Sequence, residues 1–460
     1  MIRTITLGIA TLLLLLTGPA QPQEASETAA AEAAREEAPV RSVINEEPGI
    51  EELEKMSREA YEAEKYTRYY GANIRMMNQR PYEPIYMKRV IEACALLERR
   101  RTAYHYMLKM QQQGLSYDLS EVPDAANIRT TELFDYLNNL MIEAGQPAGR
   151  AEPVLLMDDD QGMPSALTWD QSRERFLVGT LGAGAILSVT PDGNEEVLMK
   201  ADVDNGLWAI RGIHADAEKN RLWVTTSAIP EFSQYSPADR GRAALFEFDL
   251  TTLKQVNRFN VPMDGSLHDL GPIAVTDAGD VYTLDHETAM VYRKAADGQA
   301  LEPFVGSEDM DSLSAIAVSY DNRRLYVADR YKGILVVDPI EQSSTMLTGP
   351  ETLNLGRINS LSFGQKKLFM IQSGIQPERV IQLDLDEMGS GVSEVHPMAS
   401  ALEDFEGPGL SMYKGGFVYY FANLEKQGDE PFALVRTALS TLQNKPQFML
   451  DNDPEPEAGE

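Results

Sequence analysis

The sequence predicts a mainly β protein, a six-bladed β-propeller preceded by a small α-helical region. Three observations indicate this architecture: a strand-turn-strand unit occurs six times, the units are evenly spaced, and helical periodicity is confined to the chain before them. The apolar centres of successive units are 46, 60, 43, 45 and 49 residues apart. A period in this range, carried by strands, is typical of four-stranded blades arranged radially around a central channel.

Each unit contains a small or polar residue, an apolar triplet, a turn, and a strand that ends in a polar residue. The six units open at Ser165, Arg211, Gly271, Ser314, Asn359 and Glu406. The apolar centres are Leu167, Ile213, Ile273, Ile316, Leu361 and Leu410. The runs EVLMK, QVNRFNV, LEPFV, STMLT, SEVHP and QFML supply outer strands, and the run PVLLM precedes the first unit. Because a propeller ring usually closes with a strand from the far end of the chain, either PVLLM or QFML completes the sixth blade.

The beginning of the chain resembles a secretory signal peptide over residues 1–20. Arg3 precedes an apolar run from Ile5 to Leu16, and small residues follow up to Ala20. This run is too short to cross a bilayer of about 30 Å as a helix. Residues 21–50 contain seven glutamates and no aromatic residue, and residues 451–460 are similarly acidic. We therefore expect a periplasmic or secreted protein with a disordered acidic segment at 21–50 and an acidic tail at 451–460.

Residues 51–146 show helical periodicity and form the predicted helical domain, whereas the propeller is expected over 151–450. Met87, Val90, Ile91, Cys94 and Leu97 define one apolar face, and two later segments of the domain repeat the pattern. The stretch MKRVIEACALLERRRTAYHYMLKMQQQGLSYD resembles a tetratricopeptide-type helical hairpin. Cys94 is the one cysteine of the chain, so we expect a buried thiol and no internal disulfide.

Composition restricts the class of partner. The net charge of −30 and the pI near 4.6 oppose binding to a phosphate backbone, which excludes nucleic acid. No segment reaches membrane-spanning length, so we expect no membrane insertion. The remaining partners are proteins and small-molecule ligands.

The residues that open the inner strands are candidates for a ligand site, because one residue per blade converges at a channel mouth. The candidates are Ser165, Arg211, Ser314, Asn359 and Glu406, with His214, His268 and Asp269 close to them in sequence. The alternative is that strand starts are hydrophilic because they face channel water.

Arg211 and Glu406 allow two interpretations. They form a salt bridge across the channel, or Arg211 binds a carboxylate or phosphate of a ligand. His268 and Asp269 are adjacent on a strand and should point to opposite faces, so we do not expect them to act as a catalytic dyad.

The stretch SYDNRRLYVADRYKGILVVD from Ser319 and the EGP at Glu406 resemble the senescence-marker-protein/gluconolactonase-like family of six-bladed propellers. The stretch TTSAIPEFSQYSPADRGRAALFEFDL from Thr225 is similar to a second-blade insertion in bacterial members. The resemblance implies a divalent cation held by Glu, Asn and Asp, with lactone hydrolysis as the activity. At the corresponding positions this chain has Ser165, Ser314 and Asn359, which leaves Asn359 and Glu406 as candidate metal ligands.

Two functions therefore remain, and neither identifies catalytic residues. The first is an exported ligand- or protein-binding propeller with a helical interaction domain, without the family's intact metal site and without a cofactor. The alternative is a lactone or ester hydrolase that uses calcium or another divalent cation held by Asn359 and Glu406. The inserted loop, with Asp239, Arg240 and Arg242, either decorates the surface or folds over the channel mouth, and Asp239 and Arg242 are placed to pair.

Overall fold

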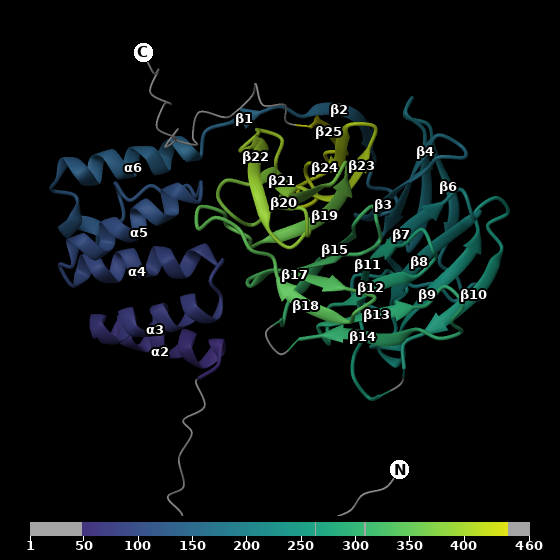
Figure 1. Cartoon of the computed structure of the whole chain (residues 1–460), viewed down its shortest axis with the longest axis horizontal. Coiled ribbons are helices and arrows are strands. Elements are labelled where there is room, and N and C mark those ends of the chain that lie inside the picture. The colour runs from purple at the N-terminus through teal and green to yellow at the C-terminus, as the bar shows by residue number, and fades with distance from the viewer. Residues whose placement is uncertain (1–47, 263, 308–309, 440–460) are drawn as a thin grey trace, which may run out of the picture. The chain divides into compact units, whose positions relative to one another are not determined.

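Within the described residues, six antiparallel sheets are arranged as blades around a central axis, and five α-helices lie beside them (Figure 1). The structure is a computed structural model in which residues 48–262, 264–307 and 310–439 are described. The prediction of a mainly β fold, a six-bladed propeller preceded by helices, is confirmed. The helices and the blades belong to one compact unit that begins at Ile50.

The helical segments precede the blades in sequence, apart from one short 3₁₀ turn. The α-helices are α2 (Ile50–Glu62), α3 (Tyr66–Gln79), α4 (Pro84–Leu96), α5 (Arg100–Gln112) and α6 (Glu132–Ala144). The 3₁₀ helices are η1 (Pro123–Ile128) and η2 (Pro237–Asp239).

Each blade is named here by its strands, with the innermost strand given first. Blade 1 comprises β3 (Pro164–Asp170), β4 (Arg175–Thr180), β5 (Ala185–Val189) and β6 (Glu195–Lys200). Blade 2 comprises β7 (Ala209–Asp216), β8 (Arg221–Ser227), β9 (Ala243–Asp249) and β10 (Gln255–Asn260). Blade 3 comprises β11 (Leu270–Val275), β12 (Val281–Asp285), β13 (Met290–Lys294) and β14 (Glu302–Gly306).

The remaining blades include the strands that close the ring. Blade 4 comprises β15 (Leu313–Val318), β16 (Leu325–Asp329), β17 (Gly333–Asp338) and β18 (Ser343–Met346). Blade 5 comprises β19 (Ile358–Gly364), β20 (Lys367–Gln372), β21 (Arg379–Leu385), β22 (Val392–Ser400) and β1 (Ala148–Gly149). Blade 6 comprises β23 (Gly409–Lys414), β24 (Phe417–Phe421), β25 (Phe432–Ala438) and β2 (Glu152–Met157).

The second strand of each blade is buried on both faces because each blade is packed between two others. Leu325–Asp329 of β16 is buried at every position, and β12 shows the same pattern. The outermost strands β10 and β18 are mostly exposed. Continuous apolar runs such as LYVAD are therefore second strands. The mixed runs that the sequence predicts as outer strands are the fourth strands β6, β10, β14, β18 and β22 of their blades, and β22 is itself covered by β1.

The ring is closed by the first long strand after the helices. β2 pairs antiparallel with β25, with Met157 opposite Phe432 and Glu152 opposite Arg436. The Arg436 guanidinium also binds the Glu152 carboxylate at 3.1 Å, so the closure carries an ion pair. The run PVLLM therefore completes the sixth blade, and QFML lies outside the described residues.

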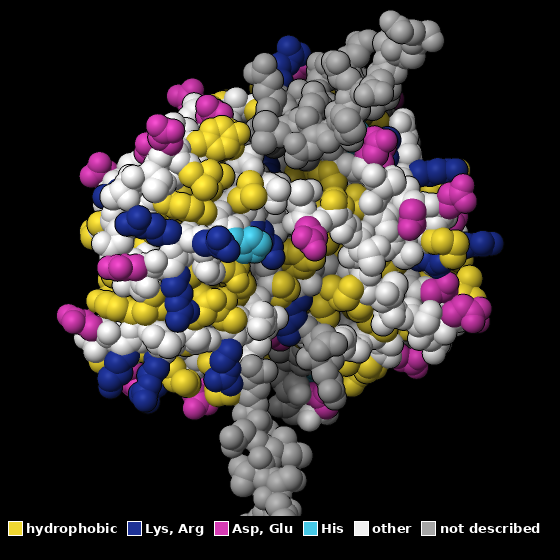
Figure 2. All heavy atoms as spheres, turned by 60° about the vertical axis from the view of Figure 1, so that its left-hand side comes forward, with side chains coloured by type: hydrophobic (Ala, Val, Ile, Leu, Met, Phe, Trp, Pro, Cys, Tyr) yellow, Lys and Arg dark blue, Asp and Glu magenta, His cyan; other side chains and the backbone are white. Residues whose placement is uncertain are grey.

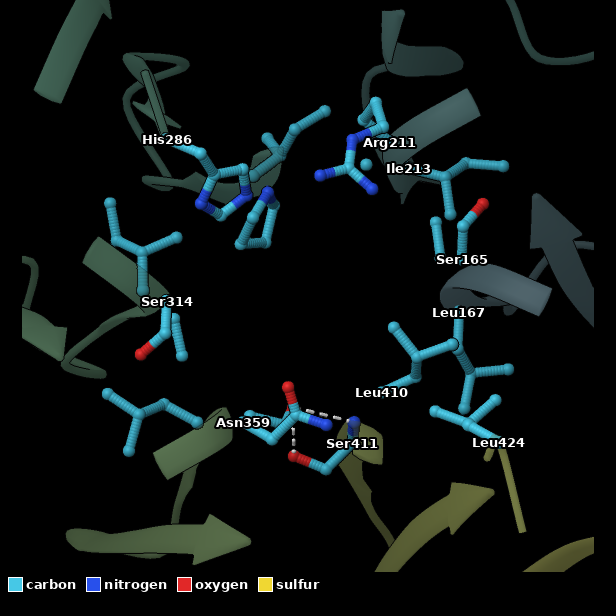
Figure 3. Close-up of a pocket in the computed structure, with 18 of the residues that line it drawn as sticks. Ser165, Leu167, Arg211, Ile213, His286, Ser314, Asn359, Leu410, Ser411 and Leu424 are labelled. Carbon is cyan, nitrogen blue, oxygen red and sulfur yellow. Dashed lines mark hydrogen bonds between the residues drawn. The ribbon is translucent and has the colours of Figure 1, made fainter. Parts of the chain in front are cut away.

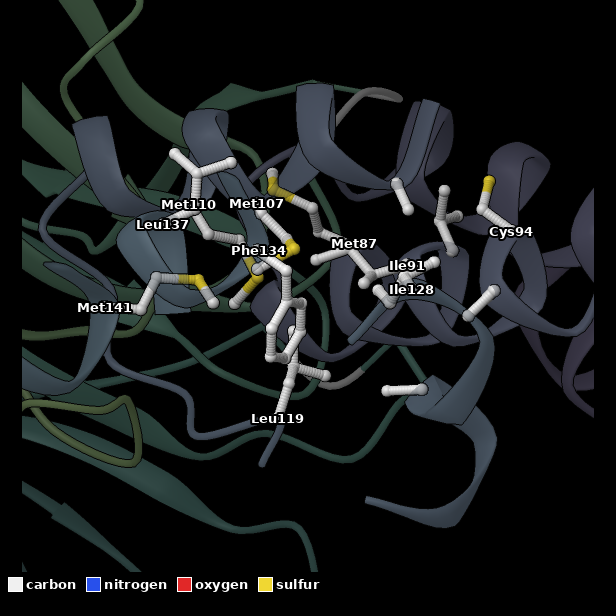
Figure 4. Packing of buried hydrophobic residues seen from close by; sticks show 14 of the residues in the cluster. Met87, Ile91, Cys94, Met107, Met110, Leu119, Ile128, Phe134, Leu137 and Met141 are labelled. Atoms are coloured by element: carbon white, nitrogen blue, oxygen red, sulfur yellow. The ribbon is translucent and has the colours of Figure 1, made fainter. Parts of the chain in front are cut away.

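The helices form a layer with its own apolar core, in which Met87, Cys94 and Met107 are buried (Figure 4). Burial raises the pKa of the Cys94 thiol to about 11, which fits the predicted structural thiol. The expected apolar face of residues 87–97 is confirmed, although Leu97 is only half-buried. The tetratricopeptide-type likeness stays a prediction.

The helical layer is joined to blade 5 through a buried arginine. The Arg379 guanidinium donates to the carbonyl oxygens of Gln113 and Gly114, each at 3.0 Å, and to Oε1 of Gln372 at 2.7 Å. Ile375 of blade 5 belongs to the apolar core of the helices. Burial lowers the pKa of Arg379 to about 10, which leaves the side chain charged at neutral pH. The layer is thus fixed to the propeller by buried polar and apolar contacts.

Seen from the side on which the helices lie, many Lys and Arg side chains are exposed among apolar ones (Figure 2). Arg99, Arg100 and Arg101 are examples at the start of α5. Among the described residues no helix is long and apolar enough to span a membrane.

Replacing Arg379 with Met should destabilise the protein, because three buried acceptors lose their donor while one buried charge is relieved. We expect a loss of about 2 to 4 kcal/mol in the free energy of unfolding, measured by urea denaturation. The control is Arg242→Met, at an exposed position, with an expected change within about 0.5 kcal/mol. Equal stability of both variants would show that Arg379 does not hold the layer in place.

Candidate functional site

A cavity of about 420 Å³ occupies one mouth of the channel. Its lining comes from the inner strands of all six blades, so it lies on the propeller axis (Figure 3). The labelled lining residues are Ser165, Leu167, Arg211, Ile213, His286, Ser314, Asn359, Leu410, Ser411 and Leu424.

Each inner strand has a β-bulge, and in four blades the bulge presents a polar residue to the cavity. The register of pairing with the second strand shifts between Pro164 and Ala166 in β3, and between Ile210 and Gly212 in β7. The other four inner strands shift at the corresponding place. A bulge leaves one residue unpaired and re-aims its side chain. The extra residues of blades 1, 2, 4 and 5 are Ser165, Arg211, Ser314 and Asn359.

Arg211 is held in place by a carboxylate from the next blade. Its Nε and Nη2 each lie 2.8 Å from the two carboxylate oxygens of Asp269, which is a bidentate pair. Nη1 of Arg211 has no hydrogen-bond partner among the described residues. The pair therefore fixes the guanidinium and leaves N–H donors for the cavity.

His286, which the sequence analysis does not identify, follows the second strand of blade 3. Asp285 at the end of β12 is buried and accepts hydrogen bonds from the backbone N–H groups of Asp269 and Glu287. The backbone N–H of His286 donates to the carbonyl oxygen of Asp269 at 2.9 Å. His286 is thereby placed beside the residue that holds Arg211, and Figure 3 shows both side chains on one side of the cavity.

In blade 3 the imidazole of His286 takes the place of an inner-strand side chain. The extra residues of β11 are Gly271 and Pro272, and a Cβ atom on Gly271 would lie 2.2 Å from Nε2 of His286. The ring therefore fills the space that the absent side chain leaves. In the sequence, only the missing side chain at Gly271 indicates that another residue fills this place. His286 is recognised as that residue only once β11 and β12 are aligned with the corresponding strands of the other blades.

The rest of the lining supplies a cation, hydrogen-bond acceptors and an apolar floor. Arg330 is exposed at the rim, and its guanidinium has no partner within the described part of the chain. Asn359 donates through Nδ2 to the carbonyl oxygen of Pro408 at 3.4 Å, and its Oδ1 has no described donor. Ser165 and Ser314 donate to backbone carbonyl oxygens.

An apolar waist separates this cavity from a second one of about 420 Å³ at the opposite mouth. Both cavities are lined by Leu167, Ile213, Ile273, Ile316 and Leu361, which are five of the six predicted apolar centres. The apolar centres of five repeat units therefore lie between the two cavities.

Five predicted site residues meet in the first cavity: Ser165, Arg211, Asp269, Ser314 and Asn359. His214 lies at the opposite mouth, where burial lowers its pKa to about 4. His268 is buried behind the cavity and contacts Asp285 at 2.6 Å and Asp264 at 3.3 Å. His268 and Asp269 therefore have different partners, which agrees with the expectation that they form no dyad.

The placement of Glu406 at an inner-strand start is wrong. β23 begins at Gly409, three residues later, and Glu406 is an exposed loop residue outside the cavity lining. Gly407 and Leu410 have positive φ values of 72° and 54°, so the EGPGL stretch is a turn into the strand. Of the two interpretations of Arg211, the salt bridge with Glu406 is wrong, because Asp269 takes that place.

The inserted loop of blade 2 contributes nothing to the lining of this cavity. η2 lies within it, and Arg242 pairs with Asp239 at 3.2 Å, as predicted. Phe232 of the same loop is buried in the core between blades 1 and 2. The loop thus packs on the blades, and its residues are absent from the described cavity lining.

The lining does not fit a hard divalent cation. Within the described residues, the cavity offers one carboxylate, Asp269, and both of its oxygens bind Arg211. Calcium requires several oxygen ligands with enough negative charge, whereas Arg211 and Arg330 bring positive charge. Asn359 remains a neutral ligand without the Glu406 carboxylate beside it.

A second group with metal-ligating atoms lies on the outer half of blade 5. Asp384, Glu394 and His396 bring one ligand atom each within 4.8 Å of one another. The Lys367 ammonium binds the Asp384 carboxylate and therefore competes with a metal ion there. This group is far from the channel in the blade, because it lies on β21 and β22.

Replacing Gly271 with Ala should displace the His286 ring, because the new Cβ would overlap Nε2. We expect a loss of about 1 to 3 kcal/mol of stability, from the clash and from the hydrogen bond between His286 Nδ1 and the Leu313 carbonyl oxygen. Urea denaturation measures the change. Gly71→Ala in α3, where nothing lies within 4 Å, should instead stabilise by about 0.5 to 1 kcal/mol. A fully stable Gly271→Ala variant would contradict this placement of the ring.

No family model matches the sequence, and a comparison with the sequences of curated proteins finds no match. Solved structures with a similar fold include a catalytically inactive virginiamycin B lyase from Staphylococcus aureus, with 12% identity and a TM-score of 0.43, over 64% of this chain and 99% of that chain. A luciferin-regenerating enzyme has 12% identity and a TM-score of 0.45, over 64% and 96%. A PQQ-bound aldose sugar dehydrogenase from Streptomyces coelicolor has 12% identity and a TM-score of 0.46, over 64% and 100%. Membership of the gluconolactonase-like family therefore stays a prediction.

Proposed function

We propose that this protein is an exported ligand-binding propeller that holds a small organic anion in the cavity beside Arg211. The observation that carries the proposal is the fixed guanidinium, whose Nη1 faces a cavity without a described partner. A guanidinium already oriented by Asp269 loses little freedom when it binds a second acceptor. Its remaining N–H donors suit a carboxylate oxygen.

The charge of the lining supports an anion. Arg211 and Arg330 contribute two positive charges and Asp269 one negative charge, so these three residues leave the cavity with one positive charge. The chain as a whole carries −30. A positive cavity in an acidic protein attracts an anion locally, whereas the remaining surface repels it.

The size and the floor of the cavity support a compact organic molecule. A volume of about 420 Å³ falls within the range of small-molecule sites. The carboxylate of the ligand would bind Arg211, and its apolar part would contact Leu167, Ile213 and Ile316 at the waist. Burial of that part contributes about 25 cal/mol per Å².

The alternative, a lactone or ester hydrolase dependent on a divalent cation, has weaker support. The donor set beside Asn359 does not fit such a cation, because Glu406 lies outside the cavity lining and Asp269 is bound to Arg211. A metal-dependent site also predicts that chelation abolishes ligand binding, which gives a direct test.

Phenylacetate is a suitable probe of the anion site, and we expect a Kd of about 0.1 to 1 mM by calorimetry. The uncharged phenylacetamide should bind at least about tenfold more weakly, because it lacks the charge that Arg211 and Arg330 attract. Arg330→Gln should weaken phenylacetate binding by about threefold to tenfold, consistent with one partly exposed charge. EDTA should leave the Kd unchanged.

The matched control is Arg323→Gln. Arg323 is an exposed arginine that precedes β16, whereas Arg330 follows that strand. We expect no change in Kd for this variant. Equal binding of phenylacetate and phenylacetamide, or loss of binding in EDTA, would refute the anion site.

Export is proposed from the resemblance of residues 1–20 to a signal peptide, which lies outside the described residues. The mature protein, purified from outside the cytoplasm, should begin close to Gln21. Intact-mass measurement checks this, and a mass that includes Met1 in exported material would be the opposite result.

A further inference from the structure

His286 lines the cavity, and its hydrogen bond defines which ring nitrogen is the acceptor. Its Nδ1 lies 2.8 Å from the carbonyl oxygen of Leu313, and a carbonyl oxygen accepts but does not donate. Nδ1 therefore carries the proton. In the neutral ring Nε2 has the lone pair, and Nε2 occupies the side-chain position that Gly271 leaves open.

The neutral form of His286 is favoured by its surroundings. Burial lowers its pKa, and the positive charge of Arg211 lowers it further, against the opposing carboxylates of Asp269 and Asp285. At neutral pH the ring therefore accepts a hydrogen bond at Nε2. The lowered pKa also makes it a weak base, so the ring is better suited to binding a hydroxyl group than to removing a proton from carbon.

Asp269 hydrogen-bonds both to the guanidinium of Arg211 and to the backbone of His286. The carboxylate of Asp269 holds Arg211 at 2.8 Å, while its carbonyl oxygen accepts the backbone N–H of His286 at 2.9 Å. A ligand that meets both groups needs an anionic oxygen for Arg211 and an O–H donor close to it for Nε2. Asn359, which lines the cavity from blade 5, adds a second acceptor, its Oδ1.

We propose that the bound anion is a 2-hydroxy acid with an apolar side chain, its carboxylate on Arg211 and its hydroxyl donating to His286. The hydroxyl of such an acid lies on the carbon next to the carboxylate, and the Arg211 and His286 side chains lie on the same side of the cavity (Figure 3). Its side chain then extends toward the aliphatic waist. The inference rests on the proposed anion binding and adds the chemical class of the ligand.

The test compares two acids of equal charge, mandelate and phenylacetate, which differ by the 2-hydroxyl group. In the wild-type protein at pH 7.5, calorimetry should give a Kd for mandelate about tenfold lower than the Kd for phenylacetate. One added hydrogen bond accounts for a difference of this size. O-methylmandelate keeps the oxygen but lacks the donor, and it should bind no better than phenylacetate.

His286→Asn is the informative variant, because the Asn amide N–H can still donate to the Leu313 carbonyl oxygen while Nε2 is lost. The ratio of the two Kd values is the readout, and the preference for mandelate over phenylacetate should fall to about twofold or less in this variant. The control His105→Asn makes the same substitution at an exposed position on α5 and should keep the tenfold preference.

The outcomes separate this inference from the proposal on which it rests. If phenylacetate binds and mandelate binds no better, the anion site stands and the hydroxy-acid inference is overturned. Retention of the preference in a folded His286→Asn variant overturns it too. If neither acid binds, both proposals fail. The wild-type comparison of mandelate with O-methylmandelate decides the matter even if His286→Asn does not fold.

Discussion

The propeller depends on one pairing between distant parts of the chain, that of β2 with β25. Without it, blade 6 would have three strands and an exposed edge, and the ring of inner strands would have no fixed circumference. β1, a few residues earlier, pairs with β22 of blade 5. A segment of about ten residues therefore ties the end of the helical layer to the last two blades. The long loop that this closure makes is entropically costly, and the β2–β25 hydrogen bonds and the Arg436 ion pair offset that cost.

Ring closure brings the bulges of the six inner strands together around the channel. Each inner strand leaves one or two residues unpaired at the same height, so the six blades bring their extra residues to a single ring. In blades 1, 4 and 5 these residues are Ser165, Ser314 and Asn359, whose short side chains leave room for a ligand. Arg211 is the one long side chain among them, and Asp269 holds it against the wall. The cavity is thus formed by a repeated backbone feature, while its chemistry comes from the residues that differ between blades.

The repeat pattern was sufficient to predict the number of blades and their inner strands, because these follow from periodicity. It also placed Ser165, Arg211, Ser314 and Asn359 correctly at the channel. It failed at Glu406, since blade 6 enters its inner strand through a glycine-rich turn and the strand begins later than the alignment implies. It did not identify His286, because the imidazole lines the cavity only where Gly271 on β11 has no side chain. Arg379 was equally hidden, since its acceptors are carbonyl oxygens more than 260 residues away in sequence.

In the proposed anion site, the Asp269 carboxylate favours a weakly charged ligand. It cancels one of the two arginine charges, so the attraction left for a ligand is that of about one positive charge. A dianion such as phosphate would bring a second negative charge close to Asp269, and that repulsion grows as the cavity loses water. A monocarboxylate balances the remaining charge and leaves the uncharged Nε2 of His286 free to accept a hydrogen bond. The same carboxylate that orients Arg211 therefore limits the charge of the anion, and the discrimination between monoanions falls to uncharged hydrogen bonds and to the apolar waist.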